Sequence, residues 1–558
     1  GCVAATGGGD PIERETPYRA WRPVFERLLG APDARDDAAR RTAILAKLPA
    51  VSRVLRDAAL LEAVLPYGWE DAPWMAGLSG PARARRTRIL LATLLGALVQ
   101  ERPLMLGLRN AQWLDPASTA LLADVLRLDA PIATVIALRR DPQEDEADLD
   151  AALAAPQVET IALGPMSGAE IAELCRLRLG VEAAPEALIA HVVERSDGNP
   201  AFAEEMALAL RDSGVLVVED GRARIAAGRE DPAEWRLPGT VEGVIAGRID
   251  RLPPGEQTTL KVASVIGRVF ERAALSGIHP SERDRGRIKR HCARLAALQM
   301  TPALDEGALV EEGAETACAW RFKTSLLEQV AYDGMLFSQR RALHRRMAEW
   351  LEASDAGRRP SSAALIAHHW RRAAEGRKLD ADAAAKAVEA YARAAAHAAG
   401  LSAISEAIGF WREALGLLER LPETPGRDRR ELALLLDLGP AEIAQGGFSD
   451  AGAEARFDRA RALCRVTGAE AELFRALRGL WQARIGRGEY PAARALADEM
   501  LERAEALGDP AARIEARRAS GTTRFWMGDL AGARDRLSEA AALDDAAGDA
   551  EAARLYGQ

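Results

Sequence analysis

Apolar and polar positions follow two different periods along the chain, and the first 165 residues contain both. Short apolar runs, typical of buried strands, are separated by stretches in which apolar residues recur every three to four positions, as on one face of a helix. Strands separated by helices indicate a parallel sheet covered on both faces. We therefore predict an α/β domain over residues 1–165. Its strands are expected at Cys2–Ala5, Leu104–Leu108, Ile132–Leu138 and Val158–Leu163, and its helices around Tyr18–Leu29 and at Arg88–Val99.

Residues 166–235 lose the strand pattern and are predicted to form a helical subdomain that ends in a hairpin. Ser167 followed by Glu170 is a capping-box pattern, which opens a helix. An Asp-Gly pair between two short apolar runs is typical of a tight hairpin turn. The further elements expected here are helices at Pro185–Arg195 and Phe202–Asp212 and hairpin strands at Val215–Val218 and Ala223–Ala226.

Residues 236–352 combine several helices with a small β element, which is typical of a winged-helix unit. The helices that would correspond to the DNA-contacting ones carry mixed charge, so a nucleic-acid partner is not expected. The predicted elements are helices at Val241–Leu252, Glu256–Val265 and Gln339–Leu351 and a strand pair at Gly307–Val310 and Ala319–Phe322.

From residue 353 to residue 558 only helical periodicity remains, and it repeats. Three similar segments begin at Gly447, Gly488 and Gly528, with spacings of 41 and 40 residues. Each is expected at a turn between two helices. A period near 40 residues indicates a solenoid of tetratricopeptide-like repeats, which bury a core only by stacking. We predict that this solenoid binds protein partners.

Charge and composition narrow the function classes without naming one. The net charge of −9 argues against a surface that coats nucleic acid. No run approaches about 18 apolar residues, so no membrane span is expected. The five cysteines are scattered, without the spacing of a disulfide framework or a metal site, which favours a cytoplasmic protein. The chain begins with Gly1 rather than Met, and we expect it to be a fragment.

The candidate metal-binding residues lie where the apolar run Leu104–Leu108 is followed by a polar turn and then a helix. This is the layout of the strand that holds Mg²⁺ in P-loop ATPases, where carboxylates stand at the strand end. Arg109 and Asn110 occupy those places here. A guanidinium repels Mg²⁺ and an amide oxygen is a weak ligand for it, so efficient hydrolysis is not expected. The Asp115-Pro116 pair is interpreted as a helix N-cap and first helical residue.

The phosphate-binding side of such a site is not evident either. No Gly-Lys pair occurs in the chain, and Gly7-Gly8-Gly9 is interpreted as a flexible turn. Arg139, which follows the apolar run Ile132–Leu138, either senses a γ-phosphate or belongs to a solvated charge pair with Arg140. Gly198 and Pro200 are explained locally as a helix stop and a turn, with contact from Pro200 to an adenine ring as the alternative.

Taken together, these segments resemble a known family. It is the AAA/STAND-type signal-transduction ATPase with C-terminal helical repeats that follows the catalytic domain in many class III adenylate or guanylate cyclases. A related module occurs in large LuxR-type transcription activators such as the maltose activator. The segments that carry the resemblance include Asp10–Phe25, Trp113–Pro116, Asp197–Pro200, Arg248–Pro253 and Ala263–Phe270.

The resemblance implies a nucleotide site with ATP or ADP and Mg²⁺, whose phosphate loop (Walker A) would lie upstream of residue 1. It implies that Arg139, Gly198 and Pro200 contact the nucleotide. Arg109 and Asn110 replace the acidic pair of the second motif (Walker B), and Gln112 replaces its histidine. We therefore expect a regulatory, nucleotide-responsive module of a cyclase-type signalling protein in which ATP binding is degenerate. The alternatives are a LuxR-type transcription regulator and a non-catalytic interaction scaffold.

Overall fold

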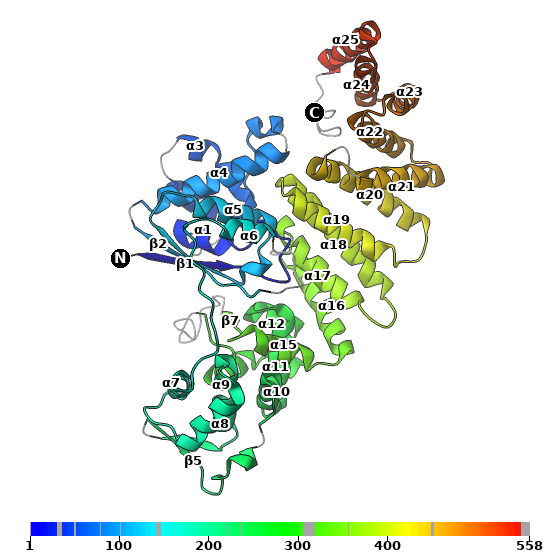
Figure 1. Ribbon diagram of the computed structural model, residues 1–558. Helices are drawn as coiled ribbons and strands as arrows, with labels where there is room; N and C mark the ends of the chain where they lie inside the picture. Colours follow the sequence, from blue (N-terminus) through cyan, green and yellow to red (C-terminus); the bar gives the residue numbers. More distant parts are fainter. Residues whose placement is uncertain are drawn as a thin grey trace. The chain divides into compact units, whose positions relative to one another are not determined.

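The computed structural model describes most of the chain as two compact units, which we treat separately (Figure 1). The first unit contains residues 1–158 and 354–558, and the second contains residues 159–353. The domain boundaries predicted above, at residues 165, 235 and 352, stay predictions. The described residues are 2–30, 36–48, 52–78, 80–100, 102–140, 147–219, 221–235, 237–304, 319–354, 357–447 and 451–547.

A three-stranded parallel sheet forms the centre of the first unit. Strand β2 (Leu104–Arg109) lies between β1 (Val3–Gly8) and β3 (Ile132–Ile136), and both pairings are parallel. The parallel strand predicted at Leu104–Leu108 is therefore confirmed, and it is the central strand of the sheet. Leu104, Leu106 and Leu108 of β2 are buried, whereas the alternate residues Met105 and Arg109 are exposed, as the period of a strand requires.

Helices pack beside this sheet and bury a large apolar core. Trp21, Phe25 and Leu29 on or beside the first helix are completely buried in it. The helices are α1 (Arg22–Leu29), α2 (Asp37–Lys47), α3 (Ser52–Arg56), α4 (Gly80–Leu98), α5 (Pro116–Leu126) and α6 (Ala147–Leu153), and short 3-10 turns lie at Ala58–Ala63, Pro73–Gly77 and Ala111–Trp113.

Two sequence predictions for this region are wrong. Val158–Leu163 is not a strand: it pairs with no strand among the described residues, and Ile161 and Leu163 are 76% and 93% exposed. An apolar run becomes a strand only where a neighbouring strand satisfies its backbone groups. Gly7 and Gly8 do not form a turn but are the last residues of β1, paired with Leu108 and Arg109.

The second unit begins with three helices and a hairpin, as predicted. The Ser167 side chain accepts a hydrogen bond from the Glu170 amide, and the Glu170 carboxylate accepts one from the Ser167 amide, so the capping box is confirmed. The elements are α7 (Gly168–Leu179), α8 (Glu186–Ser196), α9 (Pro200–Asp212) and the antiparallel strands β4 (Leu216–Glu219) and β5 (Arg222–Ile225).

The remainder of the second unit is a helical cluster with one short β ladder. Strand β7 (Ala319–Arg321) pairs with β6 (Val269–Glu271), an antiparallel partner that the sequence did not indicate. The strand predicted at Gly307–Val310 lies outside the described residues. The helices are α10 (Val241–Asp250), α11 (Pro254–Ile266), α12 (Arg272–Ile278), α13 (Glu282–Arg285), α14 (Ile288–Ala297), α15 (Ser325–Asp333) and α16 (Phe337–Ala353).

The C-terminal part of the first unit is a helical solenoid in which each helix packs against the next (Figure 1). Gly447, Gly488 and Gly528 lie in turns between helices with positive φ angles of 81°, 75° and 85°, a backbone conformation that favours glycine. The predicted repeat is thus confirmed at these turns, although Phe448–Asp450 lie outside the described residues. The helices are α17 (Ala363–Ala374), α18 (Ala381–Gly400), α19 (Ile404–Leu418), α20 (Pro425–Gly446), α21 (Ala451–Thr467), α22 (Glu470–Gly486), α23 (Tyr490–Leu507), α24 (Pro510–Trp526) and α25 (Leu530–Ala547).

Among the described residues, no helix combines the length and the hydropathy needed to span a membrane.

Candidate functional site

The predicted site lies where β2 and β3 end at the same edge of the sheet. The Ala137 amide donates to the Leu108 carbonyl at 2.8 Å and the Ala111 amide donates to the Ala137 carbonyl at 3.1 Å, so the two strand ends are joined by backbone bonds. The Arg139 amide donates to Oε1 of Gln112 at 3.3 Å. The structure therefore brings Gln112 and Arg139 together, beside the end of the strand that carries Arg109.

The turn after β2 is set by Asn110, which has a φ angle of 51°. Few residues other than glycine adopt this left-handed conformation, and asparagine is among those that do. The side chain of Asn110 makes no capping hydrogen bond to the short 3-10 turn that follows. Asn110 thus has a conformational role in directing the chain away from the sheet.

The glycine triplet Gly7–Gly9 packs against this turn. The Gly9 amide donates to the Arg109 carbonyl at 2.9 Å. A Cβ atom at Gly9 would lie 2.5 Å from the Asn110 carbonyl oxygen, and one at Gly7 would lie 2.0 Å from the carbonyl oxygen of Ala20. These distances are too short for any side chain. The glycines are therefore required for close packing of protein on protein, and their amides do not form a separate phosphate loop.

Asp115 is the first carboxylate along the chain after β2, and it is completely engaged by the protein. It is buried and caps α5: its Oδ1 accepts from the Ser118 amide at 2.8 Å and from the Tyr18 amide at 3.0 Å, and its Oδ2 accepts from the Ser118 hydroxyl at 2.5 Å. The predicted N-cap role is confirmed. Burial raises the pKa of Asp115 to about 6, although the hydrogen bonds oppose this shift.

These residues do not fit a magnesium–nucleotide complex. In P-loop nucleotide sites Mg²⁺ is held by carboxylate and hydroxyl oxygens together with phosphate. At this strand end stand a cation, Arg109, and two amides, Asn110 and Gln112, while the carboxylate of Asp115 already accepts three hydrogen bonds from the protein. We therefore derive no chemical step through a bound metal or nucleotide here.

A glutamate from the solenoid also forms a hydrogen bond with the first turn of α5. Oε1 of Glu406, on α19, accepts a hydrogen bond from the Ala117 amide in the first turn of α5 at 2.9 Å. Trp21 fixes the same turn, because its indole nitrogen donates to the Ser118 carbonyl at 3.1 Å. Glu406 is 3% exposed, and burial together with the nearby charge of Asp115 raises its pKa to about 7. Sequence reasoning missed Glu406 because 289 residues separate it from Ala117.

Gly198 and Pro200 belong to the second compact unit, whereas Arg109, Asn110, Gln112 and Arg139 belong to the first. Their local role is as predicted: α8 ends before Gly198, which has a φ angle of 73°, and Pro200 is the first residue of α9. The Asn199 side chain accepts a hydrogen bond from the Phe202 amide at 3.1 Å. The proposed contact of Gly198 and Pro200 with a nucleotide stays a prediction.

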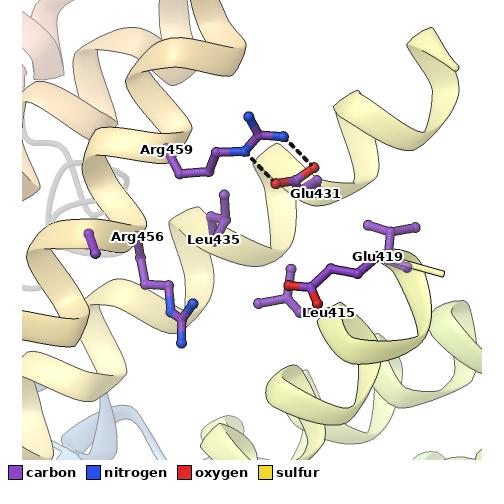
Figure 2. Close-up of a pocket in the computed structure, with 8 residues that line it drawn as sticks. Leu415, Glu419, Glu431, Leu435, Arg456 and Arg459 are labelled. Carbon is purple, nitrogen blue, oxygen red and sulfur yellow. Dashed lines mark hydrogen bonds and ion pairs between the residues drawn. The ribbon is translucent and has the colours of Figure 1, made fainter. Parts of the chain in front are cut away.

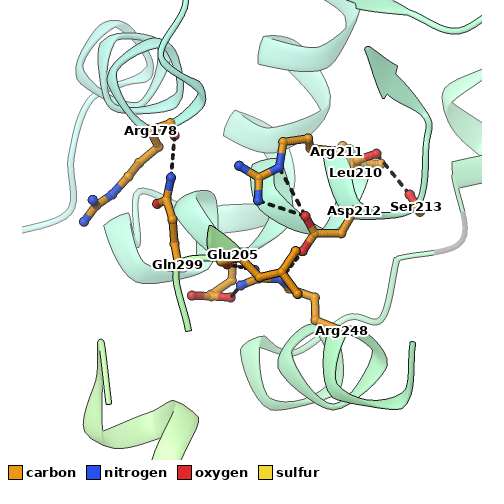
Figure 3. Close-up of polar contacts among 9 residues, drawn as sticks. Arg178, Glu205, Leu210, Arg211, Asp212, Ser213, Arg248 and Gln299 are labelled. Carbon is orange, nitrogen blue, oxygen red and sulfur yellow. Dashed lines mark hydrogen bonds and ion pairs between the residues drawn. The ribbon is translucent and has the colours of Figure 1, made fainter. Parts of the chain in front are cut away.

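A buried ionic network holds the second unit together (Figure 3). The guanidinium of Arg248, which is 1% exposed, donates to Asp212 on α9 at 2.9 Å and to the Leu298 carbonyl at 2.8 Å, and it also bonds Glu205. The guanidinium of Arg211 also donates two hydrogen bonds to Asp212. Arg248 therefore joins α9 and α10 to the segment after α14. The resemblance had singled out Arg248, but without indicating its partners.

A second ion cluster adjoins it. Glu204 pairs with Nε of Arg178 at 2.7 Å and with Nζ of Lys323 at 3.0 Å. Burial would raise the pKa of Glu204, but the two cations outweigh burial and lower it. The cluster links α7, α9 and the residues after β7. Glu204 thus has a structural role within this unit.

The solenoid contains a cavity of about 200 Å³ among α19, α20 and α21 (Figure 2). Leu415, Leu418 and Leu435 form its apolar lining. Arg459 is engaged by Glu431 through two hydrogen bonds, and Arg456 forms an ion pair with Glu442 at 3.7 Å. In Figure 2 the guanidinium of Arg456 and the carboxylate of Glu419 are directed toward the same open space. The cavity therefore combines an aliphatic floor with acidic and basic side chains.

Comparison with known proteins gives limited matches. A family model described as a domain of unknown function (DUF8739) matches residues 167–224, which run from α7 into β5. An uncharacterized protein of Rhizobium meliloti (strain 1021), R02095, is 24% identical over 401 residues, covering 69% of this chain and 34% of that protein. The chain thus spans about a third of the length of this relative.

Two solved structures are similar at low levels. One is a Signal Transduction ATPase with Numerous Domains that has a tetratricopeptide repeat sensor, from Pyrococcus horikoshii, with 12% identity and a TM-score of 0.38 over 98% of this chain and 75% of that one. The other is BtubC from P. vanneervenii, with 17% identity and a TM-score of 0.28 over 39% of this chain and 85% of that one. Similarity at these levels is too weak to transfer an activity.

Proposed function

We propose that this chain is the regulatory half of a signalling protein of the cyclase type, and that it works without hydrolysing ATP. In this proposal the solenoid binds a protein partner. Partner binding changes how the first turn of α5 is hydrogen-bonded at the edge of the sheet. This change in turn alters the activity of the catalytic domain of the parent protein. The residues at the sheet edge then serve as a structural relay rather than as an ATPase centre.

The contact between Glu406 and α5 carries this proposal. Helix α5 begins at the sheet edge, and its first turn is held by one carboxylate from its own segment, Asp115, and by one from the solenoid, Glu406. A movement of α19 would therefore withdraw an acceptor from the Ala117 amide. The Ala117 amide is half-buried, and a buried amide that loses its partner costs about 1–3 kcal/mol, which shifts an equilibrium between two arrangements about 5- to 150-fold.

The strand end supports the absence of hydrolysis. An ATPase needs a Mg²⁺ ligand and a group that orients water at this place. Arg109, Asn110 and Gln112 supply no carboxylate for the metal, and Oε1 of Gln112 already accepts a hydrogen bond from the Arg139 amide. Differential binding of ATP or ADP elsewhere in the parent protein is compatible with the proposal, because regulation by binding needs no turnover.

The cavity of Figure 2 supports partner binding by the solenoid. Its aliphatic floor can accept one apolar side chain of a partner, and Arg456 and Glu419 at its edge can pair with charges on the same segment. It lies among α19, α20 and α21, and α19 also carries Glu406. Binding there would therefore act on the helix that holds α5.

The test uses the parent protein. Its coding sequence should place a cyclase domain before residue 1, and Glu406→Ala should change the basal output of that domain severalfold or more. The matched control is Glu423→Ala, because the Glu423 side chain is 91% exposed and lies outside the contact. Unchanged output in Glu406→Ala, or a DNA-binding domain after residue 558 in place of the cyclase, would overturn the proposal.

A further inference from the structure

Positive charge is concentrated in one short stretch of this acidic chain. Between Glu282 and Arg294, six of thirteen residues are Arg or Lys and two are acidic, which gives a local net charge of +4 in a chain whose net charge is −9. The sequence alone shows mixed charge here. The fold separates it, because the acids Glu282 and Asp284 precede α14, whereas its own cations are Lys289, Arg290 and Arg294.

Helix α14 divides into an apolar face and a cationic face. Ile288, His291, Cys292 and Leu295 are buried. The exposed residues form two adjacent rows along the opposite side, which we call the cationic face: Arg287, Arg290 and Arg294 in one row, and Lys289, Ala293 and Ala297 in the other. Alanine between the cations leaves no bulky side chain to hold a partner away from the helix surface.

The cationic face is presented on a rigid support. The Thr259 hydroxyl of α11 lies 2.9 Å from Nδ1 of His291 on α14 and 3.3 Å from Nε2 of His279, which follows α12. All three groups are buried. This arrangement ties α14 to its neighbouring helices, so its outward side is fixed before any partner arrives.

Three of the four cations of this face have no ion pair to a carboxylate among the described residues. In the solenoid, arginines such as Arg459 and Arg478 are engaged by glutamates at 2.7 and 2.6 Å. On the cationic face Arg294 pairs with Glu256 at 3.1 Å. Within the described part of the chain, no ion pair joins Arg287, Lys289 or Arg290 to a carboxylate.

We propose that the cationic face of α14 binds duplex DNA by its backbone phosphates. A ten-residue helix is about 15 Å long, and a helix of this kind fits the major groove of B-form DNA, which is about 12 Å wide. The deep, narrow major groove of A-form RNA does not admit it. A membrane surface is a poorer match, because interfacial helices need large apolar residues beside the cations, and this face has only alanines between them. An acidic protein would find no apolar anchor on it.

The proposal is independent of the proposed function and is tested on the whole chain. Fluorescence anisotropy with a labelled duplex of about 20 base pairs would compare the unaltered chain with Lys289→Ala/Arg290→Ala. The control is Arg393→Ala/Arg465→Ala, which removes two exposed solenoid cations and leaves the same net charge. Thermal melting of all three proteins checks that the fold is kept.

The cationic face has four cations, and one phosphate contact for each predicts a slope of about −3.6 for log affinity against log salt. This slope corresponds to about a 100-fold loss of affinity between 50 and 200 mM salt. Lys289→Ala/Arg290→Ala should weaken binding at least tenfold at 50 mM and reduce the slope by about 2. The control should bind as the unaltered chain does. Absence of DNA binding at 50 mM salt, an equal loss in the control, or tighter binding to duplex RNA, anionic vesicles or polyglutamate would each overturn the proposal.

Discussion

Replacement of Glu406 by Gln should stabilise the junction between α5 and the solenoid at alkaline pH. Gln keeps an oxygen that can accept from the Ala117 amide, the bond that Glu406 forms at 2.9 Å, but it removes a buried negative charge beside Asp115. Glu406 has its pKa raised to about 7, by burial first and by the Asp115 charge second. Asp115, with a pKa raised to about 6, is affected in the same direction.

The direction in which stability changes with pH follows from the linkage between proton binding and folding. A carboxyl whose pKa is higher in the folded than in the unfolded state binds its proton more tightly when folded, so stability falls as pH rises between the two values. For Glu406 the window runs from the ordinary glutamate pKa of 4.5 to about 7. A shift of this size corresponds to roughly 3 kcal/mol above pH 7. This is an upper bound for Glu406, since Asp115 and Glu406 are coupled and cannot be counted independently.

Hydrogen exchange at the first turn of α5 reads this junction directly and does not require the whole chain to unfold in one step. In the unaltered chain, protection of this turn, corrected for the intrinsic pH dependence of exchange, should fall between pH 5 and pH 8. In Glu406→Gln protection should fall less, because only Asp115 still titrates there, and it should exceed that of the unaltered chain at pH 8 by up to about 100-fold. Glu423→Gln, at a 91% exposed side chain, serves as the control. Constant protection in the unaltered chain, or a loss in Glu406→Gln as large as in Glu406→Ala, would refute this reasoning.

Further predictions concern packing and charge. Arg248→Met should destabilise the second unit by about 3–5 kcal/mol in chemical denaturation, because Glu205 and Asp212 would keep buried charges without their shared partner. A loss of stability below about 1 kcal/mol would contradict the structural role of this ionic network. Gly7→Ala should cost about 1–3 kcal/mol, since its Cβ would lie 2.0 Å from the Ala20 carbonyl oxygen. Gly96→Ala in α4, where a Cβ would meet open space, should instead be neutral or stabilising by up to about 1 kcal/mol. Equal effects of Gly7→Ala and Gly96→Ala in thermal melts would refute the packing argument.

Local patterns were sufficient to predict much of the fold. The buried leucines of β2 predicted a central strand, Asp115-Pro116 predicted the cap of α5, and the recurring glycines at 447, 488 and 528 predicted the turns of the solenoid. In each case a few adjacent residues determine the backbone conformation. Such signals are therefore visible without knowledge of distant contacts.

The remaining features depend on partners far away in the sequence. Val158–Leu163 has the composition of a strand but pairs with none among the described residues, and β6 pairs with β7 although about fifty residues separate them. The glycine triplet 7–9 is explained only by the backbone of Ala20 and Asn110 that packs on it. At the candidate site, the substitutions at Arg109 and Asn110 were evident from sequence, but the contact of Glu406 with Ala117 was not.

The most direct test of the central claim is Mg²⁺-dependent hydrolysis of ATP to ADP and phosphate by the parent protein, measured separately from any formation of cyclic nucleotide. If Arg109 and Asn110 leave the sheet edge without a metal ligand, no release of ADP above the background of a metal-free control is expected, and Asn110→Ala should not change that result. Mg²⁺-dependent release of ADP that Asn110→Ala abolishes would show that this strand end still holds the metal, and would contradict the account.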